Sequence, residues 1–486
     1  MPGKKRSLGF DRRVARFEFR PHVGEAEKII KLMAAAGVEV LVASGMHQDG
    51  WAAFPSKVAV PHPEMNPDFI RHLISLAHRH DIMVLSWYNM RQNVPLVSLH
   101  PEWQVVMKLP DGRLVPEETN FCLFSSPYQE FVRAFSAEIL QQGFDGLWYD
   151  GSWPGNREHP SCYCRWCQEA FARETGQKLP ETIDWNNWVF RDWIRWRYRR
   201  FDEFVTGLYQ SLVARWPQAI IMMNHYNRPA VRSAEPEEGS SWKWGVSIDV
   251  MKFPGGGGNE NTAVINRLHT TGFNARIVKA QCPHRFDVWE PGGTLWRSVV
   301  YPELENDPTH SILHGVWTIA LGGVPWTALT NVLTRHGKPD PAVMKEWKKR
   351  RRFLGGEALT YCGLHYSQSS RDFWGRNTPN AYYGEVYGWY DVAVEGHFLT
   401  DLVLDQHLTD LKYLQRYRVL ILPNSACLSE TQGETLRQFV RDGGVVVASY
   451  ETGLYDENGE KRKDFLLKDV FGINYQETVS LTPGPW

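Results

Sequence analysis

The chain has no excess of charge of one sign and no apolar run long enough to cross a membrane. Its 486 residues carry 54 Lys and Arg against 55 Asp and Glu, for a formal net charge of −1. Such a balance offers no broad electrostatic footprint for nucleic acid or for an anionic membrane. No apolar leader segment follows the basic residues 1–6. We therefore expect a cytoplasmic protein with no nucleic-acid and no membrane partner.

Cysteine is also scarce. Seven cysteines, an odd number, do not indicate a secreted disulfide framework. Aromatic residues are abundant by contrast, with 21 tryptophans. Platforms for sugar rings are one explanation for these tryptophans, although packing in the core must account for most of them.

Strand and helix patterns alternate from about residue 14 to residue 355. Strands are expected at 15–20, 38–43, 82–87, 144–149, 219–224, 246–252, 276–281 and 324–329, and helices at 24–36, 67–80, 126–142 and 185–215. This alternation predicts an α/β protein with a (β/α)8 TIM-type barrel over residues 1–355.

The pattern changes near residue 356. A short buried strand at 419–422 precedes an amphipathic helix at 428–442, for which Ser429 is the candidate cap, and a further strand follows at 445–449. These features predict a second, smaller α/β domain of the open-sheet type over residues 356–486.

One predicted strand ends in a carboxylate. Residues 143–151 read Gly-Phe-Asp-Gly-Leu-Trp-Tyr-Asp-Gly, an apolar-rich run that delivers Asp150 to its C-terminal end. Barrel enzymes keep their chemistry at that end of the strands. The pair Trp148 and Tyr149 suits a pocket for a sugar ring. The alternative is that Asp150 only caps the next element.

Two segments resemble α-L-fucosidases of glycoside hydrolase family 29. Residues 43–57 read Ala-Ser-Gly-Met-His-Gln-Asp-Gly-Trp-Ala-Ala-Phe-Pro-Ser-Lys, similar to the His-His-Asp-Gly-Phe…Pro-Ser-Lys segment whose histidines hold fucose hydroxyls. The resemblance implies sugar-binding roles for His47, Gln48 and Trp51. Residues 148–151 are similar to the nucleophile strand Trp-Phe-Asp-Gly, which implies that Asp150 forms a glycosyl ester.

Nearly the whole chain is similar to the "hypothetical glycosyl hydrolase 6" group, which includes the α-L-fucosidases of family 151. Segments 253–258, 284–293 and 330–341 carry this likeness. A retaining hydrolase needs a second carboxyl roughly 5–5.5 Å from the nucleophile. We favour Glu290, because Trp289 and nearby glycines offer an apolar wall that would raise its pKa. The other candidates for the acid/base are Asp287, Glu260, Glu235, Glu237 and Glu238.

Several side chains at or near predicted strand ends are candidates for lining the sugar site, with packing or loop anchoring as the alternative for each. They are Trp87, Asn224, His225, Arg285, Trp289 and Trp326.

The cysteines resemble a metal site. Cys162, Cys164 and Cys167 form a C-x-C-x₂-C run, and Cys122 stands upstream in Asn-Phe-Cys-Leu-Phe-Ser-Ser-Pro-Tyr. Both segments look like those of family 42 β-galactosidases, where they bind one zinc ion. The resemblance implies a closed, structural zinc site of four thiolates, with His159 as the substitute if Cys122 does not reach. Four reduced thiols are the alternative, and no organic cofactor is expected.

The second domain resembles the trimerisation domain of β-galactosidases, which has a glutamine-amidotransferase-like fold. The likeness lies in Leu-Pro-Asn at 422–424, Leu-Ser at 428–429 and the segment 439–444. It implies a homo-oligomer that assembles through this domain. Amidotransferase activity is not expected, because no strand end carries a cysteine nucleophile between glycines.

These observations predict a retaining glycoside hydrolase, with α-L-fucosidase as the preferred activity. A β-galactosidase or another exo-glycosidase is the runner-up, although family 42 β-galactosidases place an Asn-Glu pair at the fourth strand, where this chain has Asp150. A barrel that binds sugar without cleaving it is the rival from another class.

Overall fold

The computed structural model describes residues 14–16, 23–47, 49–150, 161–224, 250–253, 270–281, 288–289, 320, 324–328, 348–353, 359–376 and 378–478. The chain divides into two compact units, with a boundary between residues 356 and 357. The second unit also takes in the short segment Asp184–Arg191. Each unit is described by itself.

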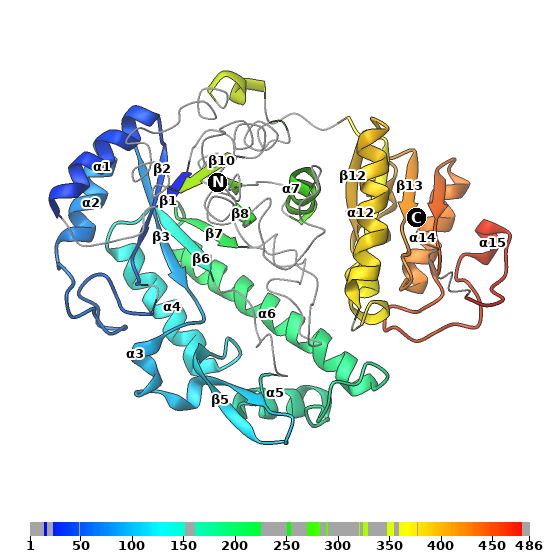
Figure 1. Ribbon diagram of the computed structural model, residues 1–486, viewed down its shortest axis with the longest axis horizontal. Coiled ribbons are helices and arrows are strands. Elements are labelled where there is room, and N and C mark those ends of the chain that lie inside the picture. The colour runs from blue at the N-terminus through cyan, green and yellow to red at the C-terminus, as the bar shows by residue number, and fades with distance from the viewer. Residues whose placement is uncertain are drawn as a thin grey trace, which may run out of the picture. The chain divides into compact units, whose positions relative to one another are not determined.

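Eight parallel strands of the first unit close into a barrel, in the order β1-β10-β9-β8-β7-β6-β3-β2. Their bounds are β1 Val14–Arg16, β2 Val40–Ser44, β3 Met83–Asn89, β6 Gly146–Asp150, β7 Ile220–Asn224, β8 Val250–Phe253, β9 Val288–Trp289 and β10 Val324–Ala328. Figure 1 shows helices α1, α2 and α4 on the outside of these strands. The predicted TIM-type barrel is confirmed.

In the part of the chain that the structure describes, helices connect β1 to β2, β2 to β3, β3 to β6, β6 to β7 and β8 to β9. The longer ones are α1 Val23–Ala36, α2 Phe69–His78, α4 Ser126–Gln141, α5 Arg165–Thr175, α6 Trp188–Arg215 and α7 Thr270–Gln281. Helix α2 shows why they cover the barrel: Phe69, Leu73 and Ala77 recur every four residues on one face, and all three are buried.

Side chains along each strand point alternately into the barrel and toward the surrounding helices. Val42, Leu85, Trp148 and Met222, one from each of four neighbouring strands, belong to a single buried cluster. Because successive residues of a strand point to opposite faces, Asp150 shares the face of Trp148, which is the inner face of the barrel.

The structure corrects one predicted strand. Residues 276–281 lie in helix α7, and the seventh barrel strand is β9 at Val288–Trp289. Phe273 and Ile277 are both fully buried, and their spacing of four residues is that of a helix. This short run was assigned to a strand because periodicity alone separates a helix from a strand poorly over six residues.

The connection from β3 to α4 contains an antiparallel hairpin that was not predicted. Strands β4 (Gln104–Lys108) and β5 (Leu114–Phe121) form it, after the short helices α3 (Val94–Val97) and η1 (Pro101–Trp103). Its turn runs through Asp111-Gly112, with Gly112 at φ +86°, and Asp-Gly is a strong hairpin signal.

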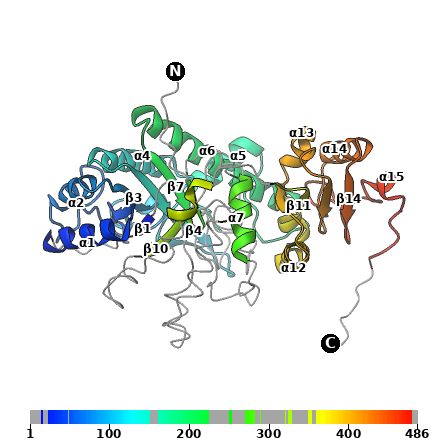
Figure 2. The same ribbon diagram turned by 90° about the horizontal axis from the view of Figure 1, so that it is seen from above.

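The second unit has an open sheet of four parallel strands in the order β12-β11-β13-β14. Their bounds are β11 Cys362–Tyr366, β12 Thr400–Leu404, β13 Val419–Leu422 and β14 Val445–Ala448. Helix α12 (Pro379–Glu395) covers one face, and α13 (Leu411–Leu414) and α14 (Glu430–Arg441) lie on the other (Figure 2). Two short segments, the π-helical η5 (Ser370–Trp374) and α15 (Lys468–Phe471), complete the unit.

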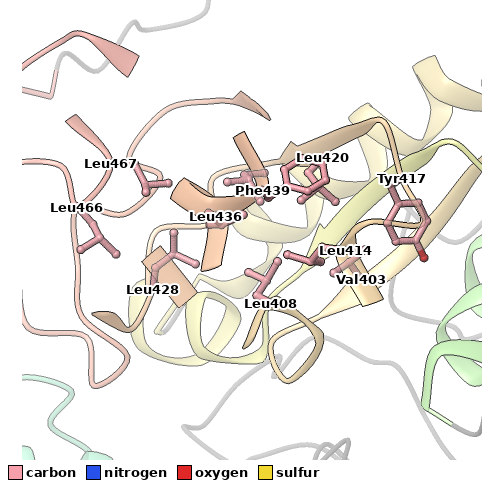
Figure 3. Close-up of a cluster of buried hydrophobic side chains, with 11 residues drawn as sticks. Val403, Leu408, Leu414, Tyr417, Leu420, Leu428, Leu436, Phe439, Leu466 and Leu467 are labelled. Atoms are coloured by element: carbon pink, nitrogen blue, oxygen red, sulfur yellow. The ribbon is translucent and has the colours of Figure 1, made fainter. Parts of the chain in front are cut away.

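The core of this unit is a cluster of leucines and aromatic residues between the sheet and α14 (Figure 3), which includes Leu420, Leu436 and Phe439. Helix α14 begins as predicted at Ser429: its side chain accepts the backbone N–H of Gln432, and the Gln432 side chain caps the Ser429 backbone N–H in return. This reciprocal cap satisfies two donors that a helix start leaves open.

His407 is a base that the second unit holds neutral. It begins the short helix η6 (His407–Thr409), its ring centroid lies 4.1 Å from that of Tyr413, and its Nδ1 accepts the Leu404 N–H at 3.1 Å. Burial, together with the nearby positive charges, lowers the pKa of His407 from 6.5 to about 4.

This low pKa makes the stability of the second unit depend on pH. The unfolded chain takes up the proton near pH 6.5 and the folded chain only near pH 4, so stability falls as the pH drops through that window. We expect a loss of about 3 kcal/mol, visible as a falling melting temperature between pH 7 and pH 4. His407→Gln should flatten that slope and the exposed-site control His72→Gln should not. Identical slopes in both variants would contradict the assignment.

Within the described ranges, no helix is both long enough and apolar enough to cross a membrane.

Candidate active site

Asp150 ends β6 at the carboxyl end of the barrel, where Trp87 of the neighbouring strand holds it. The two strands pair Trp87 with Trp148 and Asn89 with Asp150. Trp87 Nε1 donates a hydrogen bond to Asp150 Oδ2 at 3.1 Å, and the Met90 N–H donates to the Asp150 backbone oxygen at 2.9 Å. Asp150 itself is half-buried. Its carboxylate is therefore held in orientation while part of the residue stays open to solvent.

Trp87 reaches the site differently from the sugar-lining role that the sequence suggested. Only 4% of its surface is exposed, and its ring lies among the apolar side chains inside the barrel. Its contact with the site is the N–H that points at Asp150. This position makes Trp87 a positioning residue for the carboxylate.

The aromatic pair that precedes Asp150 does not form a sugar pocket. Trp148 is fully buried inside the barrel, and the Tyr149 hydroxyl donates to Ser136 Oγ of α4 at 2.7 Å. A parallel barrel strand is covered on both faces, so its aromatic residues serve the core.

Hydrogen bonds hold the loop that follows β3, the strand that pairs with the strand of Asp150. Asn89 Oδ1 accepts the backbone N–H groups of Arg91 and Gln92, at 3.0 and 3.1 Å. Arg91 is 3% exposed, and its Nη2 donates to Glu117 Oε2 of the hairpin at 2.8 Å. A buried ion pair of this kind is costly to break, which keeps the loop in one arrangement.

The loop after β2 carries His47 and Trp51, two of the residues for which the sequence predicts sugar contacts. Nearly half of the His47 side chain is exposed, and its Nδ1 lies 3.5 Å from Asp49 Oδ2. Trp51 is half-buried. The structure adds His62, which sequence reasoning missed because it lies outside the matched segment: its ring lies against those of His47 and Trp51.

A carboxylate of α4 anchors this loop. Glu138 accepts a short hydrogen bond from the Ser56 hydroxyl and a 2.7 Å bond from the Lys57 backbone N–H. At the start of the loop, the Gly45 N–H donates to Ser86 Oγ of β3 at 3.1 Å. The Pro-Ser-Lys part of the fucosidase-like segment therefore anchors the loop that carries His47 and Trp51.

The four cysteines predicted as metal ligands come together. The Sγ atoms of Cys122, Cys162, Cys164 and Cys167 all lie within 4.8 Å of one another, and all four residues are buried. A zinc ion bound by four thiolates at about 2.3 Å would set its sulfurs about 3.8 Å apart. The donor set and its size therefore fit one tetrahedral soft metal ion, and Cys122 reaches the cluster without the substitute His159.

Hydrogen bonds from the other three thiols lower the pKa of Cys164. Interactions within the cluster, together with burial, raise the pKa of Cys122 and of Cys167 well above the usual range. Negative charge therefore concentrates first on one sulfur, as expected where thiols share their protons at close range.

The cluster joins two loops of the barrel. Cys122 follows β5 of the hairpin, and the other three cysteines lie just before α5 or in its first turn. The Cys162 Sγ accepts the Val106 N–H of β4 at 3.2 Å, and the Tyr163 N–H donates to the Val106 oxygen at 2.8 Å. An ion at this place would tie the start of α5 to the hairpin.

The remaining predicted site residues lie outside what the structure describes, wholly or for their side chains. Asn224 is the last residue of β7, Trp289 is the last of β9, and Trp326 lies within β10. Gln48, His159, His225, Glu235, Glu237, Glu238, Glu260, Arg285, Asp287 and Glu290 lie outside the described residues. In the sequence, Glu290 directly follows β9.

If Asp150 is the nucleophile that the sequence predicts, removing the indole N–H of Trp87 should impair the reaction step more than binding. Trp87→Phe keeps a ring in the core and deletes one hydrogen bond to a charged group, worth about 1.5–3 kcal/mol. We expect kcat to fall about 10- to 100-fold with KM changed by less than about threefold. Steady-state kinetics on a turned-over glycoside measures this, with Trp103→Phe as the matched control. A raised KM at constant kcat would show that Trp87 contacts substrate instead.

The fold and site define a (β/α)8 barrel that presents a carboxylate at the end of its fourth strand, followed by an open parallel α/β unit. Residues 25–151 match the profile of the family described as "Hypothetical glycosyl hydrolase 6", and residues 363–485 match that described as "Beta-galactosidase trimerisation domain". The first match contains both the His47 loop and Asp150, and the second covers most of the second unit.

A segment of 69 residues is 36% identical to the β-galactosidase of Geobacillus kaustophilus, over 14% of this chain. The match spans only 10% of that relative. It therefore indicates local kinship and carries no conclusion about the activity of the whole chain.

Solved structures share the fold at low sequence identity. The β-galactosidase of Bacillus circulans sp. alkalophilus superposes with a TM-score of 0.74 at 14% identity, over 98% of this chain and 77% of that one. The α-L-fucosidase isoenzyme 2 of Paenibacillus thiaminolyticus superposes with a TM-score of 0.62 at 18% identity, over 94% and 66%. At such identities the likeness concerns the fold alone.

Proposed function

We propose that this chain is a retaining glycoside hydrolase in which Asp150 is the nucleophile. The observation that carries the proposal is the Asp150 carboxylate at the carboxyl end of β6, with one oxygen held by the Trp87 N–H at 3.1 Å. An oriented, partly exposed carboxylate at this end of a barrel is suited to attack a sugar carbon. The family match over residues 25–151 supports the same chemistry.

The reaction would proceed in two displacements. Asp150 attacks the anomeric carbon and forms a glycosyl ester while a second carboxyl protonates the leaving oxygen, and water then cleaves the ester with that carboxyl as base. Glu290 is our choice for the second carboxyl, because it directly follows β9, a neighbour of β8 and β10 in the same barrel. Parallel barrel strands end on one side, which is the side where Asp150 ends β6.

For the sugar, we propose α-L-fucose as the first choice. The support is the loop of His47 and Trp51, whose Pro-Ser-Lys segment is anchored on Glu138. A β-galactosidase is the second candidate, favoured by the family match of the second unit.

We also propose that the four cysteines bind a structural zinc ion. Four buried sulfurs within 4.8 Å of one another suit a closed site, in which no ligand position remains for substrate. The ion would supply stiffness to the loops on which it is held and would take no part in the hydrolysis.

For the second unit, we propose a glutamine-amidotransferase-like fold that joins copies of the chain. Exposed apolar side chains lie at or near the amino-terminal edge of its sheet: Tyr361, Val392, Phe398, Leu399 and Val445. Leu399, Tyr361 and Val445 directly precede or begin three of the four strands, with the exposed Arg418 before the fourth, and this edge is suited to burial against a second copy. Light scattering of the whole chain would measure the assembly.

A panel of nitrophenyl glycosides tests the activity. Turnover of the α-L-fucoside establishes the first choice, and turnover of the β-D-galactoside alone establishes the second. If neither is cleaved while both free sugars bind, the barrel is a sugar-binding module and the hydrolase proposal is wrong.

A further inference from the structure

We propose that His62 is a further sugar-contacting residue of this site, donating its Nε2–H to a hydroxyl of the substrate beside His47 and Trp51. The proposal rests on the glycoside hydrolase function proposed above and deepens it by naming a residue that selects the sugar. It starts from the way in which one loop gathers three ring side chains.

The backbone of the loop places these rings together. The His47 N–H donates to the Trp51 oxygen at 2.7 Å, the Ala52 N–H to the Val60 oxygen at 2.8 Å, and the His62 N–H to the Ala52 oxygen at 2.9 Å. Three short segments therefore run side by side, and each contributes one ring.

Gly50 allows the tight turn within this arrangement. Its φ is +102°, and a Cβ placed there would lie 2.5 Å from the Asn93 Cα. A side chain at residue 50 would therefore clash with buried backbone, so the turn that connects His47 to Trp51 has little freedom to rearrange.

The three rings form one wall. The His47 and His62 centroids lie 5.5 Å apart, and Trp51 meets His62 edge to face at 6.0 Å. Trp51 and His62 are half-buried and His47 is exposed, so a ligand can reach the wall. An indole face beside polar ring nitrogens suits a sugar, which has an apolar face and hydroxyl edges.

The hydrogen bonding of His62 fixes which nitrogen is available as a donor. Its Nδ1 lies 3.1 Å from the Glu64 backbone N–H, which can only donate. Nδ1 is therefore the acceptor, and in the neutral ring the proton is on Nε2. The structure thus presents a donor whose direction the loop backbone sets.

A donor built to meet one hydroxyl discriminates against sugars that lack it, since the unpaired group is left without its partner. His62→Phe keeps a ring that packs on His47 and Trp51 and removes both ring nitrogens: the Nε2 donor and the Nδ1 acceptor of the Glu64 N–H. His62→Gln restores a donor. His72, exposed on α2, gives the matched control His72→Phe.

The experiment measures kcat/KM of the whole chain on the turned-over glycoside and on its monodeoxy analogues. We expect His62→Phe to lose about 10- to 100-fold, mostly in KM, with His62→Gln intermediate and His72→Phe unchanged. The analogue that lacks the hydroxyl bound by His62 should be a poor substrate for the wild type. For His62→Phe, this analogue and the parent sugar should have the same kcat/KM. Equal kcat/KM in wild type and His62→Phe, or an equal further loss on every analogue, overturns the proposal.

A binding measurement separates this proposal from the activity itself. If the wild type cleaves a glycoside and His62→Phe does so equally well, His62 is wrong and the hydrolase stands. If nothing is cleaved, calorimetry with L-fucose and D-galactose decides: binding weakened by His62→Phe supports His62 without the hydrolase, and unchanged or absent binding overturns it.

Discussion

Replacement of Asp150 by glycine is expected to lower turnover of the accepted glycoside by about 10⁴-fold or more, because the proposed nucleophile is removed. The cavity left by the carboxylate admits a small anion. Azide should therefore restore part of the rate in Asp150→Gly, by attacking the anomeric carbon from the face that Asp150 occupied. The product, a glycosyl azide with the anomeric configuration opposite to that of the substrate, can be identified by NMR.

The matched control for this experiment is Asp145→Asn. Asp145 lies at the opposite end of the same strand, where its Oδ2 bonds the Val84 N–H and His78 Nε2, each at 2.8 Å. Its replacement should lower stability and leave azide without effect. Azide rescue in both variants, or full turnover in Asp150→Gly, would show that another carboxylate is the nucleophile.

Loss of one thiol from the cysteine cluster is expected to release a metal ion and destabilise the barrel. The whole chain should contain about one zinc ion per molecule, and Cys167→Ser should contain far less. We expect the melting temperature to fall by roughly 5–10 °C, since several kcal/mol of metal binding is lost. Elemental analysis and thermal unfolding measure the two effects.

Cys362→Ser supplies the control, because Cys362 is buried on β11 of the second unit and takes no part in the cluster. It should keep the metal. A chain purified under reducing conditions that holds no metal, and whose melting temperature does not respond to added zinc, would support four reduced thiols instead.

Patterns that repeat along the chain were the most predictable part of the fold. Five of the eight barrel strands, β2, β3, β6, β7 and β10, fall within two residues of their expected bounds, because buried parallel strands between amphipathic helices leave a clear signal. The seventh strand was misplaced because β9 has only two residues. So short an element depends on its pairing with β8 and β10 for its existence.

The site was predictable where a motif names its residues. The carboxylate at the end of β6 and the four-cysteine cluster follow from local spacing and resemblance. The position of His62 could not be predicted, because it depends on a loop that brings His62 back to Ala52. The bond from Trp87 to Asp150 could not be predicted either, because the two residues lie 63 positions apart and meet only through the pairing of their strands.

The sequence by itself determined the barrel, the open second sheet, the strand-end position of Asp150 and the identity of the thiols, since each is written in periodicity or short spacing. Only the tertiary structure decided which aromatic rings serve the site. Trp148 and Tyr149 directly precede Asp150 in sequence and serve the core, whereas Trp87 contacts Asp150 from the neighbouring strand. The physical reason is that a strand alternates its side chains between two covered faces, so proximity to a carboxylate is set by pairing across strands.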